Sequence, residues 1–71
     1  IMKIVMESLS ELPEQTRHIF VLNRLEYKSR KEIAVTLGVS QQKVDYHINK
    51  ANDHLRLKLK DYIPLLLLFL S

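Results

Sequence analysis

Apolar side chains recur along most of this chain at the three- and four-residue spacing that marks one face of an α-helix. Residues 2–9 contain a short run of this kind, with Ile4, Val5 and Leu9 turned inward. A second run begins at Pro13, which suits the first position of a helix because its missing N–H needs no partner there. Its apolar stripe consists of Ile19, Phe20 and Leu22, with Val21 and Leu25 beside them.

Two capping signals enclose a third helix. Ser29 followed by Glu32 has the spacing of a capping box, in which each residue bonds the backbone of the other. Gly38 is the only glycine and can adopt the left-handed conformation that ends a helix. The sequence therefore predicts a helix over about 30–37, with an inner face made up of Ile33, Ala34 and Leu37.

A fourth helix starts behind Ser40, a favourable N-cap, and we expect it to continue to about Asp61. Its apolar residues recur at steps of four, three and four, so they face the core: Val44, Ile48, Ala51 and Leu55. Polar side chains occupy the opposite face: Gln42, Tyr46, Asn49 and Asp53. Lys43 and Lys50 flank this polar row on one side, and Asp45 flanks it on the other.

The composition fits a small helical domain. Apolar residues make up 46% of the 71-residue chain and charged residues 27%, which is typical of a globular protein. A single glycine and two prolines favour helices. We predict one all-α domain over residues 1–71, with four to five helices, a helix-turn-helix at about 29–56 and an apolar tail at 63–71. We expect the winged-helix-like class of fold, without a wing.

The first residues and the lack of cysteine indicate what kind of protein the chain comes from. The first residues, Ile1-Met2-Lys3, do not resemble a natural start, and no signal peptide is visible. We interpret the chain as a fragment of a larger factor. Without cysteine no disulfide can hold the fold, which favours an intracellular, cytoplasmic protein.

Positive charge is concentrated in the second half of the chain. Residues 1–27 carry three basic and four acidic side chains, whereas residues 28–60 carry eight basic and three acidic ones. A positive field of this kind suits a surface that binds a polyanion. A solvated helical face is the alternative that charge alone leaves open.

The sequence predicts a helix-turn-helix that binds duplex DNA, because a short helix and a glycine-containing turn precede a longer helix with an outward polar row. Gln41 or Gln42 can pair with an adenine edge, Asp45 can accept from a cytosine amino group, and lysines can bind guanine or phosphate. Tyr46 offers a surface for a thymine methyl, and the open N–H groups near Ser40 can bind a phosphate. The candidate DNA-binding residues are Arg30, Lys31, Ser40, Gln41, Gln42, Lys43, Asp45, Tyr46, Asn49 and Lys50.

The segment LPEQTRHIFVLNRLEYKSRKEIAVTLGVSQQKVDYHINKANDHLR, residues 12–56, resembles the fourth conserved region of bacterial sigma factors, most closely that of the extracytoplasmic-function group. The matching features are Leu12-Pro13, Arg17, Phe20, Leu22, Glu32-Ile33-Ala34, Leu37-Gly38-Val39-Ser40, Val44, Ala51 and Leu55-Arg56. The tail KDYIPLLLLFLS resembles the C-terminal end of such factors from Bacteroidetes-type bacteria.

The resemblance implies a domain that binds the −35 promoter element while attached to RNA polymerase through the flap of its β subunit, under the control of an anti-sigma factor. It places Arg30 and Lys31 near the DNA backbone and Ser40 to Lys43 with Asp45 and Tyr46 in the groove. Asp45 and Tyr46 stand where basic or small residues are expected, which leaves the base preference open. Arg17 and Glu32 occupy charged positions of the family pattern, and we predict an ion pair between them.

Two alternatives stay open at this point. A LuxR-type or response-regulator DNA-binding domain shares the Glu-Ile-Ala and Gly-Val-Ser features. A protein-interaction module is favoured by IPLLLLFL, residues 63–70, which is shorter than a membrane span of about 20 residues. This run either packs on the domain's own core or supports binding to a partner or self-association.

Catalysis is not expected. The three histidines, His18, His47 and His54, are predicted to be solvated or at the edge of the core, and no cysteine or carboxylate cluster supports a metal site. No glycine-rich phosphate loop and no paired acid and base stand out. We therefore expect no enzyme activity and no cofactor.

Overall fold

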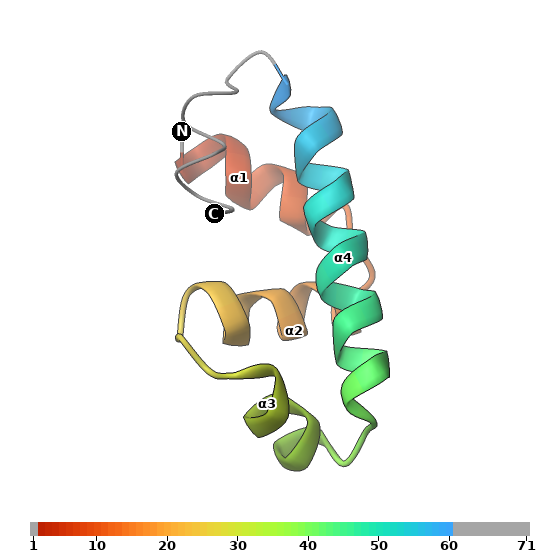
Figure 1. Ribbon diagram of the computed structural model, residues 1–71. Helices are drawn as coiled ribbons and strands as arrows, with labels where there is room; N and C mark the ends of the chain where they lie inside the picture. Colours follow the sequence, from red (N-terminus) through yellow and green to blue (C-terminus); the bar gives the residue numbers. More distant parts are fainter. Residues whose placement is uncertain (1, 61–71) are drawn as a thin grey trace.

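The computed structural model describes residues 2–60, which form four helices and no strand. The helices are α1 (Met2–Ser10), α2 (Glu14–Arg24), α3 (Arg30–Leu37) and α4 (Gln41–Lys58). Figure 1 shows the three shorter helices along one side of α4, with α1 near its C-terminal half, α2 at its middle and α3 near its start. Because α4 packs against each of the others, it connects the whole domain. The predicted all-α fold is confirmed, and the apolar tail at 63–71 lies outside the described residues.

The predicted caps of α3 are present and fix the tight joint to α4. The Ser29 hydroxyl accepts from the Glu32 N–H at 3.0 Å, and the Ser29 N–H donates to the Glu32 carboxylate at 3.0 Å. This second bond stabilises the ionised carboxylate and lowers the pKa of Glu32. Gly38 has a φ of 67°, in the left-handed region, and two residues later the Ser40 hydroxyl caps α4.

Three details differ from the sequence predictions. The ion pair predicted between Arg17 and Glu32 is wrong: both residues lie in the described part of the chain, and the Glu32 carboxylate bonds Ser29 instead. Pro13 is the N-cap of α2 rather than its first helical residue, because its backbone is extended at ψ 148°. The fourth helix ends at Lys58, three residues earlier than Asp61.

Two apolar clusters form the core, one on each half of α4. The first joins α1 and α2 to the C-terminal half of α4 and consists of Val5, Leu9, Leu12, Phe20, Ala51, Leu55 and Leu59. The second joins α2 and α3 to the N-terminal half and consists of Ile19, Ile33, Ala34, Val44 and Ile48. Neighbouring residues of α2, Ile19 and Phe20, thus belong to different clusters. The second cluster fixes the angle at which α4 leaves the helix-turn-helix joint.

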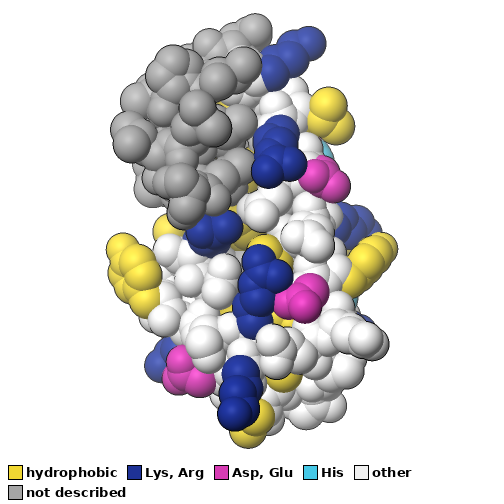
Figure 2. Space-filling model, in the orientation of Figure 1, with side chains coloured by type: hydrophobic (Ala, Val, Ile, Leu, Met, Phe, Trp, Pro, Cys, Tyr) yellow, Lys and Arg dark blue, Asp and Glu magenta, His cyan; other side chains and the backbone are white. Residues whose placement is uncertain are grey.

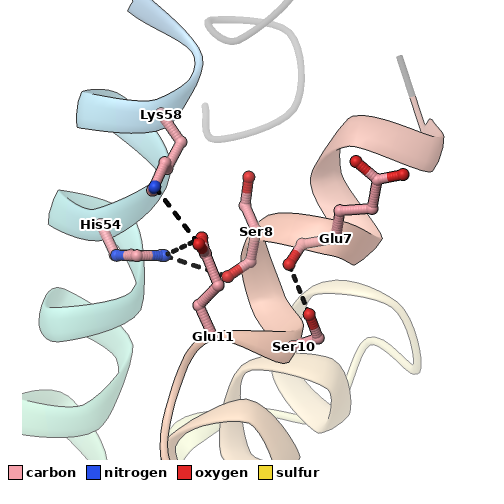
Figure 3. A network of polar contacts seen from close by, with 6 residues as sticks. All are labelled: Glu7, Ser8, Ser10, Glu11, His54 and Lys58. Atoms are coloured by element: carbon pink, nitrogen blue, oxygen red, sulfur yellow. Dashed lines mark hydrogen bonds and ion pairs between the residues drawn. The ribbon is translucent and has the colours of Figure 1, made fainter.

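A polar network holds the end of α1 against α4 (Figure 3). The Glu11 carboxylate accepts from Lys58 Nζ at 3.2 Å and from His54 Nε2 at 3.2 Å. His54 Nε2 also lies 3.0 Å from the carbonyl oxygen of Ser8. Since both partners are acceptors, Nε2 carries the hydrogen. The bond from Lys58, with the charge of the two α4 side chains, lowers the pKa of Glu11.

Candidate nucleic-acid interface

The polar row of α4 is uncovered in the folded domain. Gln42, Tyr46 and Asn49 are exposed, whereas Val44 and Ile48 on the opposite face are fully buried. Tyr46 has an exposed fraction of 59%, which is high for an aromatic side chain of a small domain. The row is therefore accessible to a ligand that approaches α4 from outside.

Tyr46 is supported from two directions on this face. The ring of His47 meets it edge-on, with the centroids 5.2 Å apart and the ring planes at 74°. Lys50 Nζ lies 5.9 Å from the centroid of the Tyr46 ring, within the range of a cation–π contact. Both contacts restrict the tyrosine ring before any ligand binds, which lowers the entropy that binding would cost.

The ring of His47 is in turn held by a hydrogen bond to a residue of α2. Thr16 Oγ1 and His47 Nδ1 are 2.8 Å apart in a buried hydrogen bond that joins α2 to α4, between residues 31 positions apart in sequence. Thr16 is fully buried and His47 is 9% exposed. Burial, together with the charges of Lys43 and Lys50, lowers the pKa of His47 below its ordinary value of 6.5.

This shift predicts a loss of stability in mild acid. The unfolded chain takes up a proton at His47 near the ordinary value of 6.5, whereas the folded chain does so only at lower pH. The free energy of unfolding should therefore be highest above this value and should fall as the pH drops through it toward the folded pKa. Chemical denaturation between pH 7.5 and about pH 5 measures the effect.

Two histidine variants assign this pH dependence. His47→Gln keeps hydrogen-bonding groups but cannot titrate, so its stability should fall less between those pH values. The control His18→Gln changes an exposed histidine of α2 and should follow the wild-type profile. Equal profiles for the wild type and His47→Gln would reject His47 as the source. The pKa values of Glu11 and Glu32 are lowered from 4.5, so their contribution to stability is lost mainly at and below that value, outside this pH range.

The remaining candidate residues surround the helix-turn-helix joint. Ser40, Gln41, Lys43 and Lys50 are exposed at or along α4, and Lys31 is exposed at the start of α3. The Ser40 hydroxyl accepts from the Lys43 N–H at 3.1 Å, so it already occupies one of the open N–H groups of the first turn. Eight of the ten candidates thus lie at the joint or in the first two turns of α4, and Asn49 and Lys50 lie further along that helix. The contact of these residues with DNA stays a prediction.

Arg30 and Asp45 are not independent members of this set. Arg30 Nη1 donates to Asp45 Oδ1 at 2.9 Å, across the turn that joins α3 to α4. Both side chains are more than half buried, with exposed fractions of 38% and 40%. The carboxylate that could accept from a cytosine therefore already has a partner within the domain.

Basic side chains are spread over the face of the domain that Figure 2 shows. Figure 2 shows Lys and Arg side chains recurring from top to bottom of one face, with fewer Asp and Glu side chains between them. This arrangement agrees with the excess of eight basic over three acidic residues in 28–60. A surface of this kind attracts a phosphate backbone without regard to sequence.

Comparison with protein families matches residues 2–55 to the family described as Sigma-70, region 4. The chain belongs to this family. Sigma-70 region 4 is the helix-turn-helix, DNA-binding part of a transcription sigma factor and is not a catalytic family. The match covers the helix-turn-helix and favours the sigma factor over the LuxR-type alternative. Searches among curated proteins and among solved structures gave no match.

The described part of the region 4 domain contains neither a candidate metal cluster nor a candidate membrane span. Within residues 2–60, no group of three or more His, Asp or Glu side chains is placed to hold a metal ion. No helix of that range is both long and apolar enough to cross a membrane.

The sequence prediction did not identify Thr16 as a buried polar residue. Helical spacing could have found it, because Thr16 lies three and four residues before Ile19 and Phe20.

Proposed function

We propose that this sigma-70 region 4 domain recognises the −35 promoter element and directs RNA polymerase to it. In this proposal α4 enters the major groove, and its first three turns carry the side chains that contact bases. Arg30, Lys31, Lys43 and Lys50 contact the phosphate backbone on either side of the groove. The observation that carries the proposal is the uncovered polar row of α4 within a region 4 fold.

The finer assignments rest on the sequence resemblance. We propose that the domain comes from an extracytoplasmic-function sigma factor of Bacteroidetes type and is part of a longer chain. Its further partners would be the flap of the polymerase β subunit and an anti-sigma factor. Such a factor acts on the chromosome, which places it in the cytoplasm of a bacterium. The apolar tail, outside the described residues, would serve a partner or self-association.

Gln42 and Lys43 are adjacent on α4, but their substitution should have different effects on DNA binding. Gln42→Ala should lower the preference for the selected base at one position by about tenfold, because a bidentate amide–base contact is lost. Lys43→Ala should weaken binding to all duplexes alike and reduce the slope of log affinity against log salt by about 0.9. Selection of bound sequences, followed by fluorescence anisotropy across a salt series, measures both effects.

Exposed residues elsewhere provide matched controls. Gln15→Ala on α2 and Lys3→Ala on α1 remove the same side chains from exposed sites away from α4, and both should bind like the wild type. A uniform loss of affinity from both Gln42→Ala and Lys43→Ala, with the base preference unchanged, would count against base reading at Gln42. A wild-type chain that binds no duplex at low salt would reject the proposed function.

A further inference from the structure

The two flanks of the polar row differ in charge. With 3.6 residues per turn, Lys43 and Lys50 lie about 80 to 100° around α4 from Gln42 on one side. Asp45 lies about 60° from Gln42 on the other side. Phosphates line both walls of a major groove, so a helix in the groove benefits from cations on both flanks. The flank of Asp45 carries an acidic residue where a cation is needed.

Arg30 supplies the missing cation on that flank. It is the first residue of α3, and its Nη1 donates to Asp45 Oδ1 at 2.9 Å. The guanidinium therefore lies at the joint of the two helices, beside the helix that would enter the groove. Among residues 2–60 this is the one polar contact of the Arg30 side chain, which leaves four of its five N–H donors available.

The two residues of this pair lie on helices that a cap and the second core cluster hold in place. Arg30 is the first residue of α3, directly after the Ser29 cap, and Ile33 and Ala34 of the same helix belong to the second core cluster. Asp45 follows the buried Val44 of that cluster. Because the guanidinium is planar and directional, one bond to Asp45 also sets the direction of its remaining donors.

From this geometry we infer that Asp45 is a positioning residue, which holds the Arg30 guanidinium so that it binds a DNA phosphate on the acidic flank of α4. The inference rests on the proposed function. It assigns Asp45 no contact with a base and replaces the cytosine contact considered from sequence. Truncation of Asp45 to alanine, which by Coulomb attraction alone should tighten DNA binding, should instead weaken it, because the acceptor that holds Arg30 is lost.

A double-mutant cycle on the 71-residue chain tests this role. The probe is a duplex selected by the wild-type chain, and the affinity is measured over a salt series. Arg30→Ala and Asp45→Ala should each weaken binding by roughly three- to tenfold and reduce the salt slope by about 0.9, the loss of one phosphate contact. The double variant should be no weaker than either single variant, because both changes remove the same contact.

Two further variants separate positioning from charge and from stability. Asp45→Asn removes the charge but retains an oxygen that accepts from Nη1, so it should keep the wild-type salt slope and bind at least as tightly. Glu7→Ala removes an exposed acidic residue of α1, outside the polar row, and should not weaken binding. An ion pair whose side chains are each more than a third exposed contributes little to folding, so the melting temperatures of all variants should lie near that of the wild type.

Tighter binding by Asp45→Ala with an unchanged salt slope would overturn the inference, since Asp45 would then act only as a repulsive charge. An unchanged slope for Arg30→Ala would overturn it too, because Arg30 would contact no phosphate. In both cases the wild-type chain still binds the duplex, so the proposed function survives. Failure of the wild-type chain to bind any duplex would reject both together.

Discussion

A Phe20→Ala variant is expected to lose its cooperative unfolding transition or to melt far below the wild-type chain. Phe20 is fully buried and is the one residue of α2 in the cluster that joins α1 to the C-terminal half of α4. Truncation of a buried phenylalanine costs about 3–5 kcal/mol. A domain of this length has a total stability of about 5 kcal/mol, so the loss consumes most of it.

Thermal melts followed by circular dichroism at 222 nm measure this effect, with Tyr27→Ala as the matched control. Tyr27 is 88% exposed, so the same truncation of an aromatic ring removes almost no buried surface there. Its φ of 58° is equally unfavourable for tyrosine and for alanine, so the backbone term cancels. If Phe20→Ala melted as close to the wild type as Tyr27→Ala, the position of Phe20 in the core would be wrong.

The second large effect concerns the buried bond between α2 and α4. Thr16→Val preserves the shape of the side chain but removes the hydroxyl that bonds His47 Nδ1 at 2.8 Å. The imidazole nitrogen is then buried without its partner, which costs about 1–3 kcal/mol. Chemical denaturation at pH 7.5 should show this loss as a lower midpoint with an unchanged slope.

Thr36→Val is the matched control for this change. Thr36 is exposed on α3, so the same substitution there should alter stability by no more than about 0.5 kcal/mol. A Thr16→Val variant as stable as Thr36→Val would mean that the hydroxyl is not needed. Loss of the bond should also free the His47 ring, so that Tyr46 loses its edge contact with that ring. The affinity for DNA should therefore be lower for Thr16→Val than for Thr36→Val.

The features that one helix or one turn determines are predictable from the sequence. The pair Ser29 and Glu32 and the left-handed Gly38 are local signals, and both ends of α3 follow from them. The stripe of Val44, Ile48, Ala51 and Leu55 is set by helical periodicity alone, and all four are buried. The exposure of the polar row on the opposite side follows from the same period.

Polar contacts between helices could not be predicted in the same way. Their formation depends on the crossing of two helices and on side-chain direction, which sequence spacing does not contain. For this reason the predicted ion pair of Arg17 with Glu32 is wrong, since the capping box already uses that carboxylate. For the same reason the bonds of Arg30 to Asp45 and of Thr16 to His47 were missed. Each of these contacts changes the role of a candidate residue.

The central claim is that the exposed polar face of α4 is the surface that meets duplex DNA. Amide chemical shifts of the labelled chain, recorded during titration with a selected duplex, test it most directly. The account predicts that the largest changes fall on residues 40–50 and on the start of α3 at Arg30 and Lys31. Changes confined to α1 and α2, with the amides of α4 unaffected at saturation, would contradict it.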